Sequence, residues 1–233
     1  MTLVAAGVAF ALMLALLFTS YRLRQAQRAD FIRSYSFPKG LIEKLQLRRP
    51  GLEAKNAQLV ARALRQFFLA HLRSGRQYVS MPSQAADDLW HEFILYTRNY
   101  ELFCRQAFGR FLHHTPAVVL GSARLGNAGL RRVWWQCCRE ENINPRHATR
   151  LPLLFALDAK LGIADGFHYV PDCGQGPRRD DRRVAGGSYC AGEFGDAGID
   201  GSTDGFGDGG GGFGGGDGDG GGDGGGCGGG GGD

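Results

Sequence analysis

The chain has 233 residues, enough for one domain of ordinary size together with additional segments. Hydrophobic residues make up 43% of it and include 15 Phe, which allows a genuine core, and the six Cys lack the spacing of a disulfide scaffold. The net charge of +4 conceals an asymmetry, because the first 183 residues hold 27 basic and 14 acidic side chains and the remainder holds nine acids and no base.

Residues 1–21 are predicted to form a transmembrane anchor. Residues 3–18 contain no polar side chain, and the flanking residues extend the stretch to about 20, which spans a bilayer core. Arg22, Arg24 and Arg28 follow at once, and positive charge after the span favours a cytoplasmic body. We therefore expect a single-pass protein of the inner or plasma membrane. A cleaved signal peptide is the alternative, although no basic residue precedes the apolar stretch.

Residues 22–50 are predicted to be a basic juxtamembrane linker. It also carries Lys39, Lys44, Arg48 and Arg49, so it either lies against anionic lipid or remains a solvated connection. A cytoplasmic body would keep the thiols reduced, and we therefore predict no disulfides.

Residues 51–173 are predicted to be a small domain of about four helices, which makes the fold class mainly α. From Leu52 to Ser74, apolar residues recur at intervals of three and four residues, which is typical of a helix with one buried face. His71 lies on this apolar face and is expected to be a core residue. A second helix begins at the N-cap Ser83 and ends at Gly109. Two further helices are expected at about 127–141 and 151–161, with a short extended piece at 167–170.

The second helix carries the densest polar chemistry of the chain. Asp87 and His91 lie four residues apart and share a helix face, so the carboxylate can orient the imidazole or join it on a metal ion. His113 and His114 both lie beyond Gly109, where the chain can turn and bring one of them back beside Asp87 and His91. Asp87, His91, His113 and His114 are therefore the candidate ligands for zinc or another divalent metal. The competing interpretation makes Asp87 a charge near the helix start and His91 a core-edge residue.

The geometry of a straight helix separates Cys104 from this cluster, because it would lie roughly 20 Å along the axis from His91. We predict that Cys104, Cys137 and Cys138 are core residues. The chain has no phosphate-binding Gly loop with a Lys, no GxSxG elbow and no HExxH motif, so catalytic residues are not identified.

The run PSQAADDLWHEFILYTRNYELFCRQAFGRFLHHTP resembles the signature of the glycine-rich-domain proteins, known from plants and with bacterial relatives. The similar positions are Asp87, Trp90, His91, Tyr100, Cys104, Gly109 and His114. The later run LPLLFALDAKLGI and the Gly-rich, Cys-containing tail are also similar to the bacterial members, so the resemblance covers about Pro82–Cys173 and the tail. It implies no established activity, and the RNA-binding module of some plant members has no counterpart here.

Residues 174–233 are predicted to be a disordered tail of Gly and Asp, because they offer too little apolar area to offset chain entropy. The acidic tail could fold back on the basic body, and its Phe-Gly pieces could make weak multivalent contacts. A calcium-binding β-roll is disfavoured because the tail lacks a nine-residue repeat.

Two functions remain open. One is a membrane-anchored binding or scaffold module, with a protein partner reached through the tail or the helical domain. The other is a metal-dependent enzyme that uses Asp87 and His91 with His113 or His114. Nucleic-acid binding by the basic body is a third, less favoured, interpretation because the basic residues are dispersed.

Overall fold

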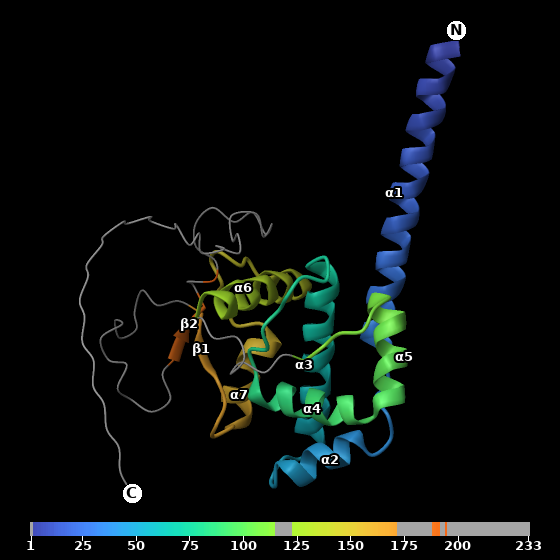
Figure 1. Ribbon diagram of the computed structural model, residues 1–233. Helices are drawn as coiled ribbons and strands as arrows, with labels where there is room; N and C mark the ends of the chain where they lie inside the picture. Colours follow the sequence, from blue (N-terminus) through green and yellow to red (C-terminus); the bar gives the residue numbers. More distant parts are fainter. Residues whose placement is uncertain (1, 115–122, 172–187, 192–193, 195–233) are drawn as a thin grey trace, which may run out of the picture.

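The computed structural model describes residues 2–114, 123–171, 188–191 and 194, and these residues are mainly α-helical (Figure 1). The predicted mainly α class is confirmed, although the described residues form seven helices where the sequence predicted an N-terminal helix and a domain of about four. The helices are α1 Thr2–Ser34, α2 Leu41–Arg48, α3 Ala54–Arg73, α4 Gln84–Leu95, α5 Thr97–Phe108, α6 Ala123–Glu140 and α7 Leu153–Leu161, and the strands are β1 His168–Val170 and β2 Ser188–Cys190.

Helix α1 is continuous over 33 residues and projects from the rest of the body (Figure 1). Its N-terminal part is apolar and exposed, with Leu12, Leu16 and Phe18 open to the surroundings. The helix is long and apolar enough to cross a membrane. A signal sequence near the N-terminus would satisfy the same criterion, so length and composition alone establish only an apolar N-terminal helix.

The stretch predicted as a linker differs in the structure, because residues 22–34 extend α1 and residues 41–48 form α2. Ile32, Leu41 and Leu45 are completely buried. These apolar residues, spaced among the basic ones, give each helix a face that packs on the body. The linker prediction is therefore wrong for the segments that hold these residues.

Helix α3 lies at the centre of the body and packs against α1, α2, α4, α6 and α7. Its buried residues include Phe67 and Phe68, whose rings contact Trp90 at centroid distances of 5.1 and 6.0 Å. His71 is also buried in this helix, as predicted, and its Nδ1 lies 3.1 Å from the carbonyl oxygen of Gln77.

The buried imidazole makes the stability of the body depend on pH. Burial lowers the pKa of His71 to about 4, whereas the unfolded chain would titrate near 6.5. Since the unfolded state binds the proton more readily, the free energy of unfolding should fall by about 3 kcal/mol as pH drops from 6.5 to 4. Urea titrations of the full chain in mild detergent across this range would measure the decline. The decline should be shallower in His71→Gln, and equal slopes would contradict the assignment.

The single helix predicted from Ser83 to Gly109 is two helices in the structure. Tyr96 adopts φ −81° and ψ 58°, which ends α4 and begins α5. Gly109 closes α5 in a left-handed conformation with φ 75°, as its sequence position suggested. The break turns α5 alongside α1, where Phe31 and Phe103 are 5.9 Å apart between ring centroids.

The predicted helices at about 127–141 and 151–161 are present as α6 and α7, and the extended piece is β1. β1 pairs in parallel with β2, with His168 opposite Ser188. Phe194 is buried against Trp134 and Phe155. Residues 188–191 and 194 thus depart from the predicted disordered tail, and the rest of that tail lies outside the described residues.

Candidate metal centre

The N-terminus of α4 is tied down by hydrogen bonds before the candidate ligands begin. Ser83 is the N-cap, as predicted, and its hydroxyl accepts a hydrogen bond from the Ala86 amide. Asp158 of α7 is buried, and its carboxylate accepts hydrogen bonds from Ser83 Oγ at 2.7 Å and from the Gln84 amide at 2.7 Å. Helix α4 therefore starts at a fixed position, one turn before Asp87.

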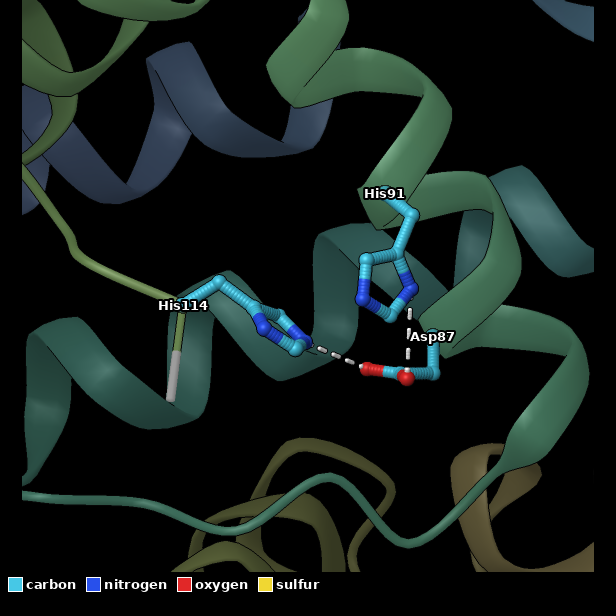
Figure 2. A group of neighbouring side chains, drawn as sticks. All are labelled: Asp87, His91 and His114. Atoms are coloured by element: carbon cyan, nitrogen blue, oxygen red, sulfur yellow. Dashed lines mark hydrogen bonds and ion pairs between the residues drawn. The ribbon is translucent and has the colours of Figure 1, made fainter. Parts of the chain in front are cut away.

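Asp87 and His91 face each other on α4, as their spacing predicted. Asp87 Oδ2 lies 3.3 Å from His91 Nδ1 (Figure 2). The side chain of His91 is 39% exposed and that of Asp87 is 21% exposed, so the pair sits at the edge of the body.

His114 joins this pair from the segment that follows α5. Its Nε2 lies 2.9 Å from Asp87 Oδ1, and its ring centroid lies 4.2 Å from that of His91. Figure 2 shows both imidazoles directed toward the same carboxylate. The structure therefore brings Asp87, His91 and His114 together.

His113 does not belong to this group. It is exposed, and its ring lies 4.8 Å from the ring of Phe111. Adjacent side chains in an extended segment point to opposite sides, which places one imidazole at the cluster and the other away from it. The sequence left the two histidines equivalent, and the path of the chain separates them.

Two buried aromatic residues hold His114 in place. The Tyr100 hydroxyl donates to the Leu112 carbonyl oxygen at 2.5 Å and accepts from Trp90 Nε1 at 3.1 Å. The Trp90 ring also contacts His114, with centroids 4.5 Å apart. Nothing in the sequence indicated this support from Trp90 and Tyr100, since a hydrogen bond to a loop carbonyl leaves no trace in a periodic pattern.

The three side chains suit a divalent metal ion. Their candidate ligand atoms lie within 4.8 Å of one another. Two ligands of a tetrahedral zinc ion are separated by about 3.4 Å, given metal–ligand bonds of about 2.1 Å. The two carboxylate–imidazole distances of 2.9 and 3.3 Å are close to that separation. His91 Nδ1 is buried beside Asp87 Oδ2 and forms no hydrogen bond with any residue that the structure describes, so a metal ion would satisfy a polar atom that otherwise lacks a hydrogen bond.

The neighbouring acids of α4 are engaged elsewhere. Asp88 is buried and pairs with Arg48 and Arg49, and Glu92 pairs with Arg48 at 3.3 Å. These contacts join α4 to the end of α2. They leave Asp87 as the carboxylate of this helix that faces the two histidines.

The cysteines behave as core residues. Cys104, Cys137 and Cys138 are buried free thiols, in agreement with the sequence prediction. Burial raises the pKa of Cys104 and raises that of Cys138 to about 12. Thiols that stay protonated at neutral pH are poor metal ligands.

Comparison with known proteins matches residues 27–194 to the UCP032817-like family. The chain belongs to this family. The match starts just before Ala29, where burial begins, and ends at Phe194, the last described residue of the core. It therefore covers the body, including the cluster, without the apolar half of α1. No curated protein and no solved structure matches the chain.

The predicted relationship to the glycine-rich-domain proteins is wrong. The matching family is a different and uncharacterised one, and nothing in the comparisons indicates a glycine-rich-domain family. The motif residues that suggested it are explained by structure instead. Trp90, Tyr100 and Gly109 pack or terminate helices, while Asp87, His91 and His114 form the polar cluster.

Proposed function

We propose that this protein is a membrane-anchored helical module that binds one divalent transition-metal ion through Asp87, His91 and His114. The observation that carries the proposal is the convergence of two imidazoles on one carboxylate from separate segments of the chain. Imidazole and carboxylate together suit zinc and similar borderline metals.

The apolar half of α1 supplies the anchor in this proposal. It is followed by Arg22, Arg24 and Arg28, with no acidic residue before Asp30, which favours a cytoplasmic body at the inner or plasma membrane. The C-terminal end of the same helix packs into the body, so a membrane-embedded α1 would hold the metal cluster at a fixed distance from the bilayer. A protein partner that recognises the body or the tail is consistent with such a module.

Metal analysis of the purified full chain tests the proposal. We expect about one zinc, iron or related ion per chain after purification without added chelator, and its recovery after chelation and zinc addition. A chain that retains no metal and does not bind added zinc would contradict it. Sedimentation with membranes that resists alkaline carbonate would support the anchor independently of the metal.

A metal-dependent enzyme is the second candidate, and the exposure of His91 favours it. A zinc ion with three protein ligands keeps a position for water and lowers the pKa of that water to about 7. The acids next to the cluster, Asp88 and Glu92, are paired with arginines and point toward α2. A binding module is therefore the better-supported function.

Nucleic-acid binding is less favoured than the sequence alone suggested. Several basic residues of the body are neutralised by nearby carboxylates. Arg33 and Arg73 pair with Glu140, Arg49 with Asp165, and Arg150 with Glu141. Charges paired in this way contribute little to phosphate binding.

The hydrogen bonds of Tyr100 give the metal proposal a further test. In Tyr100→Phe the Leu112 carbonyl and the Trp90 N–H lose their partner, and His114 loses its fixed position. We expect metal affinity to fall about tenfold, as for other residues that orient a metal ligand. Competition with a chelating dye, at a temperature where the variant is folded, would measure it. Tyr96→Phe is the control, since its hydroxyl makes only an exposed 3.5 Å contact with Lys39, and an equal effect in both variants would refute this role.

A further inference from the structure

The C-terminal end of α5 lies on the side of the body from which α1 departs. Tyr35 contacts Phe93 of α4, Phe31 contacts Phe103 in the middle of α5, and Arg28 reaches Gly109 at its end. The two helices are therefore antiparallel, and the end of α5 faces the apolar half of α1 (Figure 1).

Three arginines gather at this end of α5. The guanidinium of Arg28 lies 2.8 Å from the point where a Cβ on Gly109 would stand. Arg76, which follows α3, donates to the Phe108 carbonyl oxygen at 3.0 Å. Arg110 donates to the Arg76 carbonyl oxygen. None of the three forms an ion pair with a carboxylate among the residues that the structure describes.

Capping of α5 explains only part of this arrangement. A cation near a helix C-terminus is favourable, and Arg76 meets that need with one of its five N–H groups. Arg28 and Arg76 place their guanidinium groups at the adjacent residues Gly109 and Phe108, and Arg110 contacts the Arg76 backbone, so like charges that repel one another are held near the same helix end. Arg76 also adopts a left-handed backbone with φ 63°, an uncommon conformation for a side chain of this size. The positive charge of Arg110 and Arg76 reaches the buried His71, where it adds to burial in lowering the pKa.

We propose that Arg28, Arg76 and Arg110 bind the phosphate of anionic lipid headgroups in the membrane that α1 enters. This inference rests on the proposed membrane anchor, and not on the metal. Arg22 is the first charged residue after the apolar stretch and so marks the edge of the hydrocarbon core. Arg28 lies six residues beyond it, or about 9 Å along the helix. The headgroup layer is about 5–8 Å thick on each side, so an extended arginine at Arg28 reaches it. Guanidinium groups bind phosphate oxygens by paired, charge-assisted hydrogen bonds.

Lysine and arginine residues elsewhere do not share this position. Lys44 lies on α2 and Arg49 follows it, at the opposite end of the body from the arginine cluster (Figure 1). Arg49 pairs with Asp88 and Asp165. The part of the predicted linker from Lys39 onward therefore does not contribute to lipid binding in this proposal.

Native mass spectrometry of the full chain in mild detergent would test the site, with phosphatidylglycerol and phosphatidylcholine added separately. We expect the wild-type chain to bind phosphatidylglycerol more tightly. The double variant Arg28→Gln/Arg110→Gln should bind it about 25-fold more weakly, because each basic side chain at an anionic surface contributes about fivefold. Arg62→Gln/Arg98→Gln removes the same charge from exposed positions elsewhere and should stay within twofold of wild type.

Equal binding of the two lipids by the wild type would overturn the proposal, as would equal losses in the two double variants. Soluble glycerol phosphate is the third ligand, and binding as tight as that of the lipid would show a site for free phosphate instead. If circular dichroism shows that the double variant does not fold, the single variant Arg110→Gln replaces it, because that side chain is exposed. It is expected to bind phosphatidylglycerol about fivefold more weakly than the wild type. If the mass of the purified protein shows that the apolar half of α1 has been removed, the anchor and the lipid site are refuted together. If the protein has its full-length mass but binds the two lipids equally, only the lipid site is refuted.

Discussion

His114→Ala is expected to remove the bound metal ion, whereas His113→Ala should leave it in place. The structure directs His114 at Asp87 and places His113 against Phe111 on the outside. A zinc site of four ligands binds with about 10–16 kcal/mol, so one ligand contributes about 3 kcal/mol and its loss weakens binding more than a hundredfold. Metal content by inductively coupled plasma mass spectrometry and affinity by dye competition would measure the effect.

The two histidine variants form a matched pair, since they change the same side chain at adjacent positions. Asp87→Asn and His91→Ala should resemble His114→Ala if all three residues are ligands. Equal metal content in the His113 and His114 variants would contradict the proposed site. Substitution of cobalt for zinc in the wild type offers a second readout, because the intensity of its visible absorption reports tetrahedral coordination even if one variant is unstable.

Asp158→Asn is expected to reduce the free energy of unfolding by about 4 kcal/mol. The carboxylate is 1% exposed and accepts four hydrogen bonds, from the Ser83 hydroxyl and from the amides of Gln84, Ala85 and Phe167. An asparagine of the same size would turn an NH2 group toward N–H donors. Gly166 packs so closely on Asp158 that a Cβ there would lie 2.6 Å from the Asp158 Cβ, which leaves little room to adjust.

Asp165→Asn is the control for this prediction. Asp165 is also an acid near the end of α7, but it is 61% exposed and pairs with Arg49 at the surface. Its replacement should cost less than about 1 kcal/mol. Urea unfolding of both variants, with metal removed, would separate stability from metal binding, and similar midpoints would show that Asp158 does not anchor α4.

Local patterns in the sequence were sufficient for most helices. The spacing of apolar residues predicted α3, α6 and α7 to within a few residues, and Ser83 and Gly109 marked helix ends where the structure has them. The break at Tyr96 was not predictable in the same way. Phe93 and Tyr100 are seven residues apart, which keeps both on one face of an unbroken helix, so periodicity gives no signal of the turn.

Composition misled the prediction where a few apolar residues lie in polar surroundings. Residues 22–50 were predicted to be a basic linker, yet Ile32 of α1 and Leu41 and Leu45 of α2 are enough to fix this segment to the core. The same holds for Phe194, one aromatic residue in a Gly-rich stretch that fills a space beside Trp134. A single buried side chain contributes about 1.5–3 kcal/mol, which average composition does not register.

The sequence by itself determined the apolar N-terminal helix, the helical class and the Asp87–His91 pair, because each depends on residues close together in the chain. The choice of His114 over His113 and the gathering of Arg28, Arg76 and Arg110 were decided only by tertiary structure. Both depend on the turn at Tyr96, which carries α5 back along α1 and returns the following segment to α4. Contacts between residues distant in sequence arise from how the helices pack, and no local pattern records that packing.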